Sequence, residues 1–186
     1  MFGETFTIID TPGLDSSPRA NLAVLKTIAE KLAEITSGGR STVSGVIYFH
    51  PITDLRLTGP ARTQIQILEQ ICGESFYART AVVTTMWNRI NKEDVMYDKL
   101  HENFGRKYPH LTRPNTFFKF LNDKDSAAAV LKRLLAVARS PVPGRPATLQ
   151  LQSEVARMGT SAGSMRKTQA GKRIESDMDR GFCTIL

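Results

Sequence analysis

The stretch Phe6-Thr7-Ile8-Ile9-Asp10-Thr11-Pro12-Gly13 joins a short run of β-forming residues to a tight turn. The run Phe6–Ile9 predicts a strand that ends at Asp10. Ligands of open parallel sheets bind at the carboxyl ends of the strands, where Asp10 would stand. An aspartate there can hold Mg²⁺, and the backbone N–H of Gly13 can approach a phosphate because no side chain covers it. An ordinary strand-to-loop turn has the same residue types, so both interpretations stay open at this point.

Strand-like and helix-like segments alternate along the chain after this turn. A helix from Ser17 to Gly38 is predicted by an N-cap serine, a proline in the first turn and apolar residues at helical spacing. The alternation implies parallel strands joined by right-handed crossovers. The sequence therefore predicts an α/β fold with a mostly parallel sheet flanked by helices. The further predicted strands are Val43–His50, Ala81–Thr85 and Thr116–Phe120, and the further predicted helices are Ala61–Cys72, Lys92–Lys107 and Ser126–Ala138.

The composition excludes several classes of protein. Apolar residues make up 41% and charged residues 23% of the chain, so it can form a packed core. No run of apolar residues is long enough for a transmembrane helix, and the N-terminus has no secretory pattern, so we expect a cytoplasmic protein. Two cysteines cannot form a disulfide framework. The net charge of +7 allows contact with anions, but no interleaved basic and aromatic surface predicts a specific nucleic acid as partner.

The composition changes near Ser140. The stretch Ser140–Pro146 is rich in proline and cannot continue a helix, so it is interpreted as a linker. From Ser140 onward the chain has seven Lys/Arg and four Asp/Glu residues, and Phe182 is the only aromatic residue. The sequence therefore divides into a body, residues 1–139, and a linker with a basic C-terminal tail, residues 140–186. The tail is expected to be helical or disordered, with a solvated helix over Ala147–Asp179 that is interrupted between Gly159 and Gly163.

Several short motifs, taken in order, resemble one family. Asp10-Thr11-Pro12-Gly13 resembles the third guanine-nucleotide motif of P-loop GTPases, and more narrowly that of septin-like and immune-associated proteins found as fungal G-domain proteins. Val82–Asn88 resembles the strand and base-recognition motif of this group, and Phe118–Ala127 resembles the last strand and the loop beside the base. The likeness spans nearly the whole chain, and the ordered set is more specific than any one motif. The other resembling segments are Gly45–His50, Ile52–Arg56, Leu149–Gln152 and Thr168–Gly171.

The resemblance implies a partial G domain that binds GTP or GDP with Mg²⁺. It assigns Asp10 to the metal, Gly13 to the γ-phosphate, and Thr85, Met86 and Asn88 to the guanine base. It also implies GTP hydrolysis in a complete domain, and it allows homo-oligomers that form through the G domain. No catalytic residue is predicted, because Leu14 stands where Ras-like enzymes have the glutamine that positions water.

The phosphate-binding loop of the family is missing. No Gly-x-x-x-x-Gly-Lys-Ser/Thr occurs, and the nearest string, Gly38–Thr42, has arginine in place of lysine and follows a helix instead of a strand. The resemblance therefore implies a G domain truncated at its N-terminus, without its first two strands and phosphate loop. We expect such a chain to bind guanine nucleotide poorly. The alternative is a nucleotide-free pseudo-GTPase that acts as a scaffold or interaction module.

The base-recognition motif departs from the family pattern Asn/Thr-Lys-x-Asp. In Thr85-Met86-Trp87-Asn88, methionine replaces lysine and asparagine replaces aspartate. An amide offers one good acceptor and places donors where guanine also donates, so Asn88 suits guanine less well than a carboxylate. Asn91-Lys92-Glu93-Asp94 matches the pattern letter for letter, but it opens a predicted helix and is equally typical of a helix cap. The Thr85 register is favoured.

The last four residues, Cys183-Thr184-Ile185-Leu186, form a Cys-a-a-X pattern whose terminal leucine suggests geranylgeranylation of Cys183. Basic residues upstream would assist binding to anionic lipid; they are Arg166, Lys167, Lys172, Arg173 and Arg180. Membrane association through a C-terminal lipid is therefore one expectation, and a chance terminal cysteine is the other.

Overall fold

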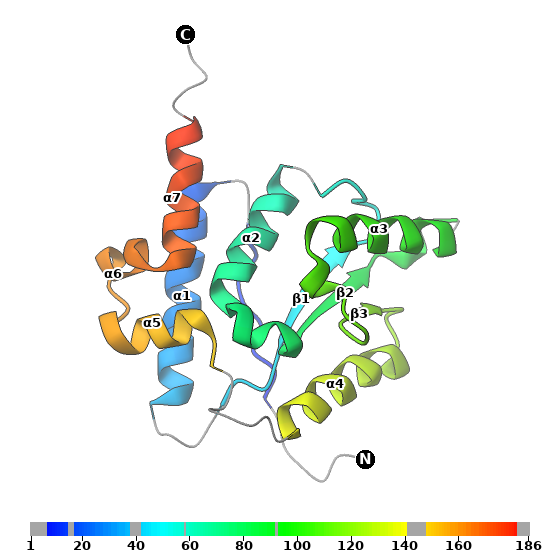
Figure 1. The fold of residues 1–186 in the computed structure, drawn as a ribbon, viewed down its shortest axis with the longest axis horizontal. Coiled ribbons are helices and arrows are strands. Elements are labelled where there is room, and N and C mark those ends of the chain that lie inside the picture. The colour runs from blue at the N-terminus through cyan, green and yellow to red at the C-terminus, as the bar shows by residue number, and fades with distance from the viewer. Residues whose placement is uncertain are drawn as a thin grey trace.

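A parallel three-stranded sheet forms the centre of the molecule. The computed structural model describes residues 7–14, 17–37, 42–57, 59–91, 93–140 and 148–181. The sheet has the order β1 (Val46–Pro51), β2 (Thr80–Thr85), β3 (Phe117–Lys119), and both pairings are parallel. Helices lie on both sides of it (Figure 1). The predicted α/β class with a parallel sheet flanked by helices is therefore confirmed, with each of these three strands close to its predicted place.

The four helices predicted in the body are all present. They are α1 (Pro18–Thr36), α2 (Pro60–Cys72), α3 (Glu93–Lys107) and α4 (Lys124–Arg139). Short 3₁₀ helices precede or follow the strands: η1 (Glu74–Arg79), η2 (Trp87–Arg89) and η3 (Pro109–Leu111). The tail adds α5 (Gln150–Met158), α6 (Ala162–Lys167) and α7 (Gln169–Gly181).

Helix α1 begins where the sequence predicts. The Ser17 hydroxyl accepts a hydrogen bond from the backbone N–H of Ala20 at 3.4 Å, and Pro18 occupies the first turn. The inner face of the helix is buried at Leu25, Ala29 and Leu32, which follow the helical period. The helix ends at Thr36; its predicted end, Gly38, lies outside the described residues.

The two faces of the sheet are covered by different helices. Alternate residues of a strand point to opposite faces, so Val82 and Val83 on β2 enter separate clusters. Val82 packs with α2 and α3 residues such as Ile65 and Phe104, whereas Val83 packs with α4. In Figure 1 the sheet accordingly lies between α3 and α4. This double cover explains why every residue of β2 except the last is buried.

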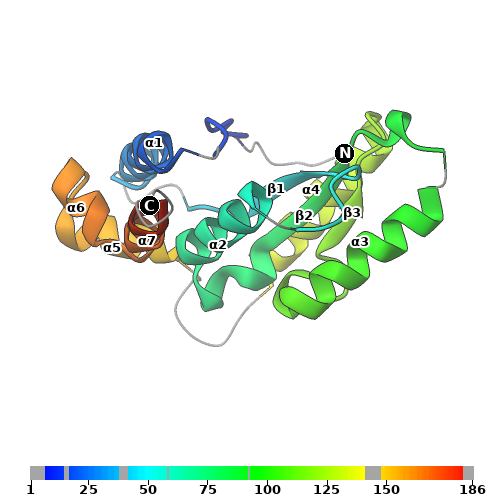
Figure 2. The same cartoon turned by 90° about the horizontal axis from the view of Figure 1, so that it is seen from above.

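The tail packs against the body, so the expectation of a solvated helix is wrong for its inner face. Figure 2 shows α5, α6 and α7 gathered beside α1 and α2, away from α3. The tail has few apolar residues, but they lie on one side and add to a core that α1 and α2 already begin. The predicted interruption is present, since Gly159 has a left-handed φ of +75° after α5. The buried apolar tail residues are Leu149, Leu151, Val155, Met165, Ala170 and Ile174.

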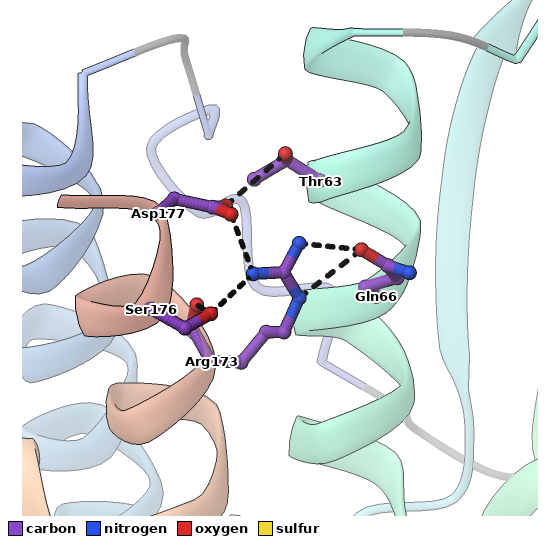
Figure 3. Close-up of polar contacts among 5 residues, drawn as sticks. All are labelled: Thr63, Gln66, Arg173, Ser176 and Asp177. Atoms are coloured by element: carbon purple, nitrogen blue, oxygen red, sulfur yellow. Dashed lines mark hydrogen bonds and ion pairs between the residues drawn. The ribbon is translucent and has the colours of Figure 1, made fainter. Parts of the chain in front are cut away.

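Polar contacts fix α7 to α2. Figure 3 shows the Arg173 guanidinium donating to Oε1 of Gln66 at 3.0 and 2.5 Å, and to Oδ1 of Asp177 at 2.7 Å. The other Asp177 oxygen accepts from the Thr63 hydroxyl at 3.3 Å. A planar guanidinium holds two acceptors in fixed directions, so these bonds set the register of α7 along α2.

A buried carboxylate fixes the turn between α6 and α7. Glu154 on α5 is 3% exposed, and its two oxygens accept from the backbone N–H of Gln169 at 3.2 and 3.3 Å. The Gln150 side chain donates to the same group at 3.0 Å. The first N–H groups of a helix have no partner within the helix, so Glu154 supplies an acceptor at the start of α7.

The predicted strand Phe6–Ile9 is not formed at residues 7–9, and Phe6 lies outside the described residues. A segment becomes a strand only when a neighbouring strand pairs with its backbone, and in the described part of the chain β1 pairs with β2 alone. The segment 7–14 is held instead by the Gln64 side chain, which donates to the Leu14 carbonyl at 2.7 Å. Ile8 and Ile9 are therefore 68% and 38% exposed.

Candidate functional site

The carboxyl end of β2 carries the residues predicted to contact a base. Thr85 ends the strand, and Met86 follows with a left-handed φ of 62° and a side chain that is 43% exposed. Asn88 is exposed in η2. Between them, Trp87 is buried and its indole N–H donates to the Thr84 carbonyl at 2.9 Å. The turn is thus anchored by Trp87, while Met86 and Asn88 remain accessible.

The carboxyl end of β3 lies directly beside this turn. Thr84 joins the two, because its carbonyl accepts from the Phe120 N–H at 2.9 Å and its hydroxyl donates to the Phe118 carbonyl at the same distance. Leu121 follows and is 50% exposed. Asp123 then caps α4 by accepting from the Ser126 N–H at 2.7 Å, and the hydrogen bonds from Ser126 hold the pKa of this carboxyl below its usual range.

Lys119 on β3, which was not predicted as a site residue, lies near this edge of the sheet. The Lys119 ammonium lies 4.8 Å from the ring centroid of Trp87 and 4.8 Å from that of Tyr97, so two aromatic faces hold the cation. The only available signal was a lysine within the aromatic strand Phe117–Phe120, which does not specify which rings it meets. Lys119 gives this part of the sheet a fixed positive charge.

Asp10 and Gly13 lie elsewhere. Both belong to the irregular, exposed segment 7–14, and Asp10 lines a hollow of about 310 Å³ with the α1 residues Thr27, Ile28, Glu30, Lys31 and Glu34. None of Thr85, Met86 and Asn88 lines this hollow. The structure brings the three base residues together, but it does not join them to the residues predicted for metal and phosphate. The two glutamates near Asp10, Glu30 and Glu34, pair with Lys26 and Lys31, and no group of three His, Cys, Asp or Glu side chains in the described residues is arranged as a metal site.

A larger hollow of about 930 Å³ lies between the end of α1, η1 and α5, far along the chain from every predicted site residue. Its walls are mainly hydroxyl and amide side chains; they include Thr36, Ser37, Ser75, Gln150, Gln152 and Ser153. None of the described residues that line it is charged, so this part of its wall offers no strong site for a phosphate.

The remaining candidates fall at the ends of described segments. In the alternative register, Asn91 is exposed, Lys92 lies outside the described residues, and α3 begins at Glu93. Cys183 also lies outside them. Of the basic residues upstream of Cys183, Arg166 pairs with Glu175 at 2.5 Å and Arg173 is engaged at α2. Across the described ranges, no helix has the length and apolar character needed to span a membrane.

Comparison with known proteins adds no relative: no family model, no curated protein and no solved structure matches this chain.

Proposed function

We propose that the chain is a GTPase-like α/β domain that carries the base-recognition half of a guanine-nucleotide site, within a partial P-loop NTPase fold. One observation supports this most strongly. The Thr85–Asn88 turn and the Phe120–Asp123 loop stand side by side at the carboxyl ends of adjacent parallel strands. That edge is where open α/β sheets bind their ligands. Thr85, Met86 and Asn88 are the proposed base contacts.

The proposed site is weak as it stands. Guanine presents N–H donors to this position, and the Asn88 amide offers a single acceptor where a carboxylate offers two. The exposed Met86 side chain can cover the flat face of a base as an apolar group. In a complete domain, Asp10 would hold Mg²⁺ and Gly13 would approach the γ-phosphate; the metal would neutralise phosphate charge. With Asp10 in the hollow beside α1 and no phosphate loop in the sequence, we expect weak binding of guanine nucleotide and little or no GTP hydrolysis.

We expect the double substitution Met86→Lys, Asn88→Asp to raise affinity for GDP by about ten- to a hundredfold, because hydrogen bonds to a charged group contribute about 1.5–3 kcal/mol. Both side chains are exposed, so the fold should tolerate the changes. Isothermal titration with GDP and Mg²⁺ measures the effect, and titration with ADP measures its specificity for guanine.

Asn91→Asp is a control for the added carboxylate, since it introduces one near Asn88 but outside the proposed base contacts. It should leave GDP affinity unchanged. If GDP and ADP bind the double variant equally, or if Asn91→Asp produces the gain, the proposed base site is wrong.

A nucleotide-free scaffold is the second candidate, and the lack of a phosphate loop in the sequence, with Met86 and Asn88 in the base motif, favours it. If even the double variant does not bind GDP, that result would support the scaffold function. Attachment to a membrane through a lipid on Cys183 and self-association through the sheet domain are compatible with both candidates.

A further inference from the structure

Glu69 and His110 form a close pair at the amino end of the sheet, opposite the proposed base site. Glu69 lies on α2 and His110 on η3, with Oε1 and Nε2 2.8 Å apart. The Tyr77 ring from η1 stacks on the imidazole at 4.2 Å between centroids. The pair is mostly buried, with side chains 17% and 20% exposed. Three chain segments that lead into the sheet therefore meet at one titratable contact.

The attraction between these two side chains depends on their protons. His110 Nε2 is buried and makes no well-directed hydrogen bond within the described part of the chain, although it lies at ion-pair distance from Glu69. Burial raises the pKa of Glu69 to about 7. Burial lowers the pKa of His110, and the nearby Arg113 lowers it further, while Glu74 acts in the opposite direction. The pair therefore carries a single proton between the lowered pKa of His110 and the raised pKa of Glu69, about 7.

The surrounding groups destabilise the pair both when it carries no proton and when it carries two. The charge of Glu69 acts on Cys72 on α2, Tyr77 on η1 and Tyr108 before η3, and none of these three side chains can supply a positive charge. Loss of the last proton thus leaves a carboxylate with little compensation; Arg62 and Arg173 act on Tyr108. A second proton creates a half-buried cation that faces Arg113 and has only Glu74 to offset it.

Hydrogen bonds connect this pair to strand β3. The Leu111 N–H in η3 donates to the Tyr108 carbonyl at 2.9 Å, and the Leu111 carbonyl accepts from the Thr116 hydroxyl at 3.0 Å. The Thr116 carbonyl in turn accepts from the Val82 N–H of β2 at 2.7 Å. Movement of η3 away from α2 would therefore loosen the place where β3 joins the sheet.

We propose that Glu69 and His110 act as a proton-operated latch, which holds η3 against α2 while the pair carries one proton and releases it when the pair gains a second proton or loses its last. This device is independent of nucleotide binding and extends beyond the proposed function. Its physical basis is the close contact, its burial and its position at the junction of α2, η1 and η3.

The test is hydrogen exchange of the Leu111 amide, followed by NMR from about pH 5 to 8.5. His110 has a lowered pKa, so its contribution is lost as pH falls; Glu69 has a raised pKa, so its contribution is lost as pH rises through about 7. We expect the protection factor to be highest near neutral pH and to fall about tenfold at each end. Glu69→Gln should abolish the alkaline fall and keep the acid one.

His101→Gln is the control, because His101 stacks on Tyr97, meets the Phe117 ring edge to face and is not part of the pair. This variant should keep both the acid and the alkaline fall of the Leu111 protection factor. A flat wild-type profile, or an alkaline fall that persists in Glu69→Gln, would overturn the latch. If Glu69→Gln does not fold, the wild-type profile and the imidazole titration decide: His110 must titrate below an exposed histidine and sense a second titration near pH 7.

Discussion

Gly171→Ala is expected to lower the free energy of unfolding by about 3 kcal/mol, because the site has no room for a methyl group. A Cβ at this position would lie 1.9 Å from the backbone oxygen of Met165, at the turn between α6 and α7. A backbone atom cannot rotate aside as a side chain does, so the two helices would have to separate. The Gly171 N–H also donates to the Thr168 hydroxyl at 3.0 Å, and this bond would be strained with them.

Gly163→Ala provides the matched comparison. Gly163 lies inside α6, and a Cβ there would meet nothing within 4 Å. Alanine favours helical backbone over glycine, so this variant should be more stable by about 0.5–1 kcal/mol. Urea unfolding followed by circular dichroism measures both variants. Equal free energies of unfolding for the two variants would contradict the close approach of Gly171 to the Met165 oxygen.

The elements predicted well are those whose signals are local. The start of α1 was predictable because Ser17 and Pro18 act within one turn of the helix. Strand β2 was predictable because Ala81–Thr85 combines apolar and β-branched residues over the length of a strand. Each of these signals is complete within a few residues.

The elements predicted poorly depend on distant partners. Thr7–Ile9 has the composition of a strand, but composition does not supply the neighbouring backbone that a strand needs. The tail has too few apolar residues for a core of its own, which concealed that Leu151 and Ile174 complete the core of α1 and α2. In both cases tertiary contacts determined what the segment does.

The candidate site was predictable in part. The order of strand and turn predicted that Thr85, Met86 and Asn88 would stand at the end of β2, where they are. Asp10 was predicted to lie at the sheet edge near the base site because a strand was expected before it. That strand is not formed at residues 7–9, so the prediction lost its basis. The cation–π contacts of Lys119 could not be predicted, because the two aromatic rings come together only in the folded chain.

Leu151→Asp tests whether the tail and the sheet domain unfold together. Leu151 is fully buried on α5, so this change removes an apolar side chain from the core and places a carboxylate there without a partner. We expect the free energy of unfolding to fall by about 4 kcal/mol or more, a large share of the 5–15 kcal/mol typical of a domain. Gln152→Asp, at the next and more exposed position, should change it by less than about 0.5 kcal/mol.

Trp87 makes the experiment specific. It is the single tryptophan of the chain, and it packs with α2 and α3 in a cluster that contains none of the described tail residues. If the contacts of α7 and α5 with α1 and α2 make one cooperative unit, the unfolding midpoint reported by Trp87 fluorescence will fall together with the helical signal. If the Trp87 midpoint stays at its wild-type value while helix is lost, the tail is a separate folding unit. The predicted boundary at residue 140 would then separate two independently unfolding parts of the chain, as well as two regions of different composition.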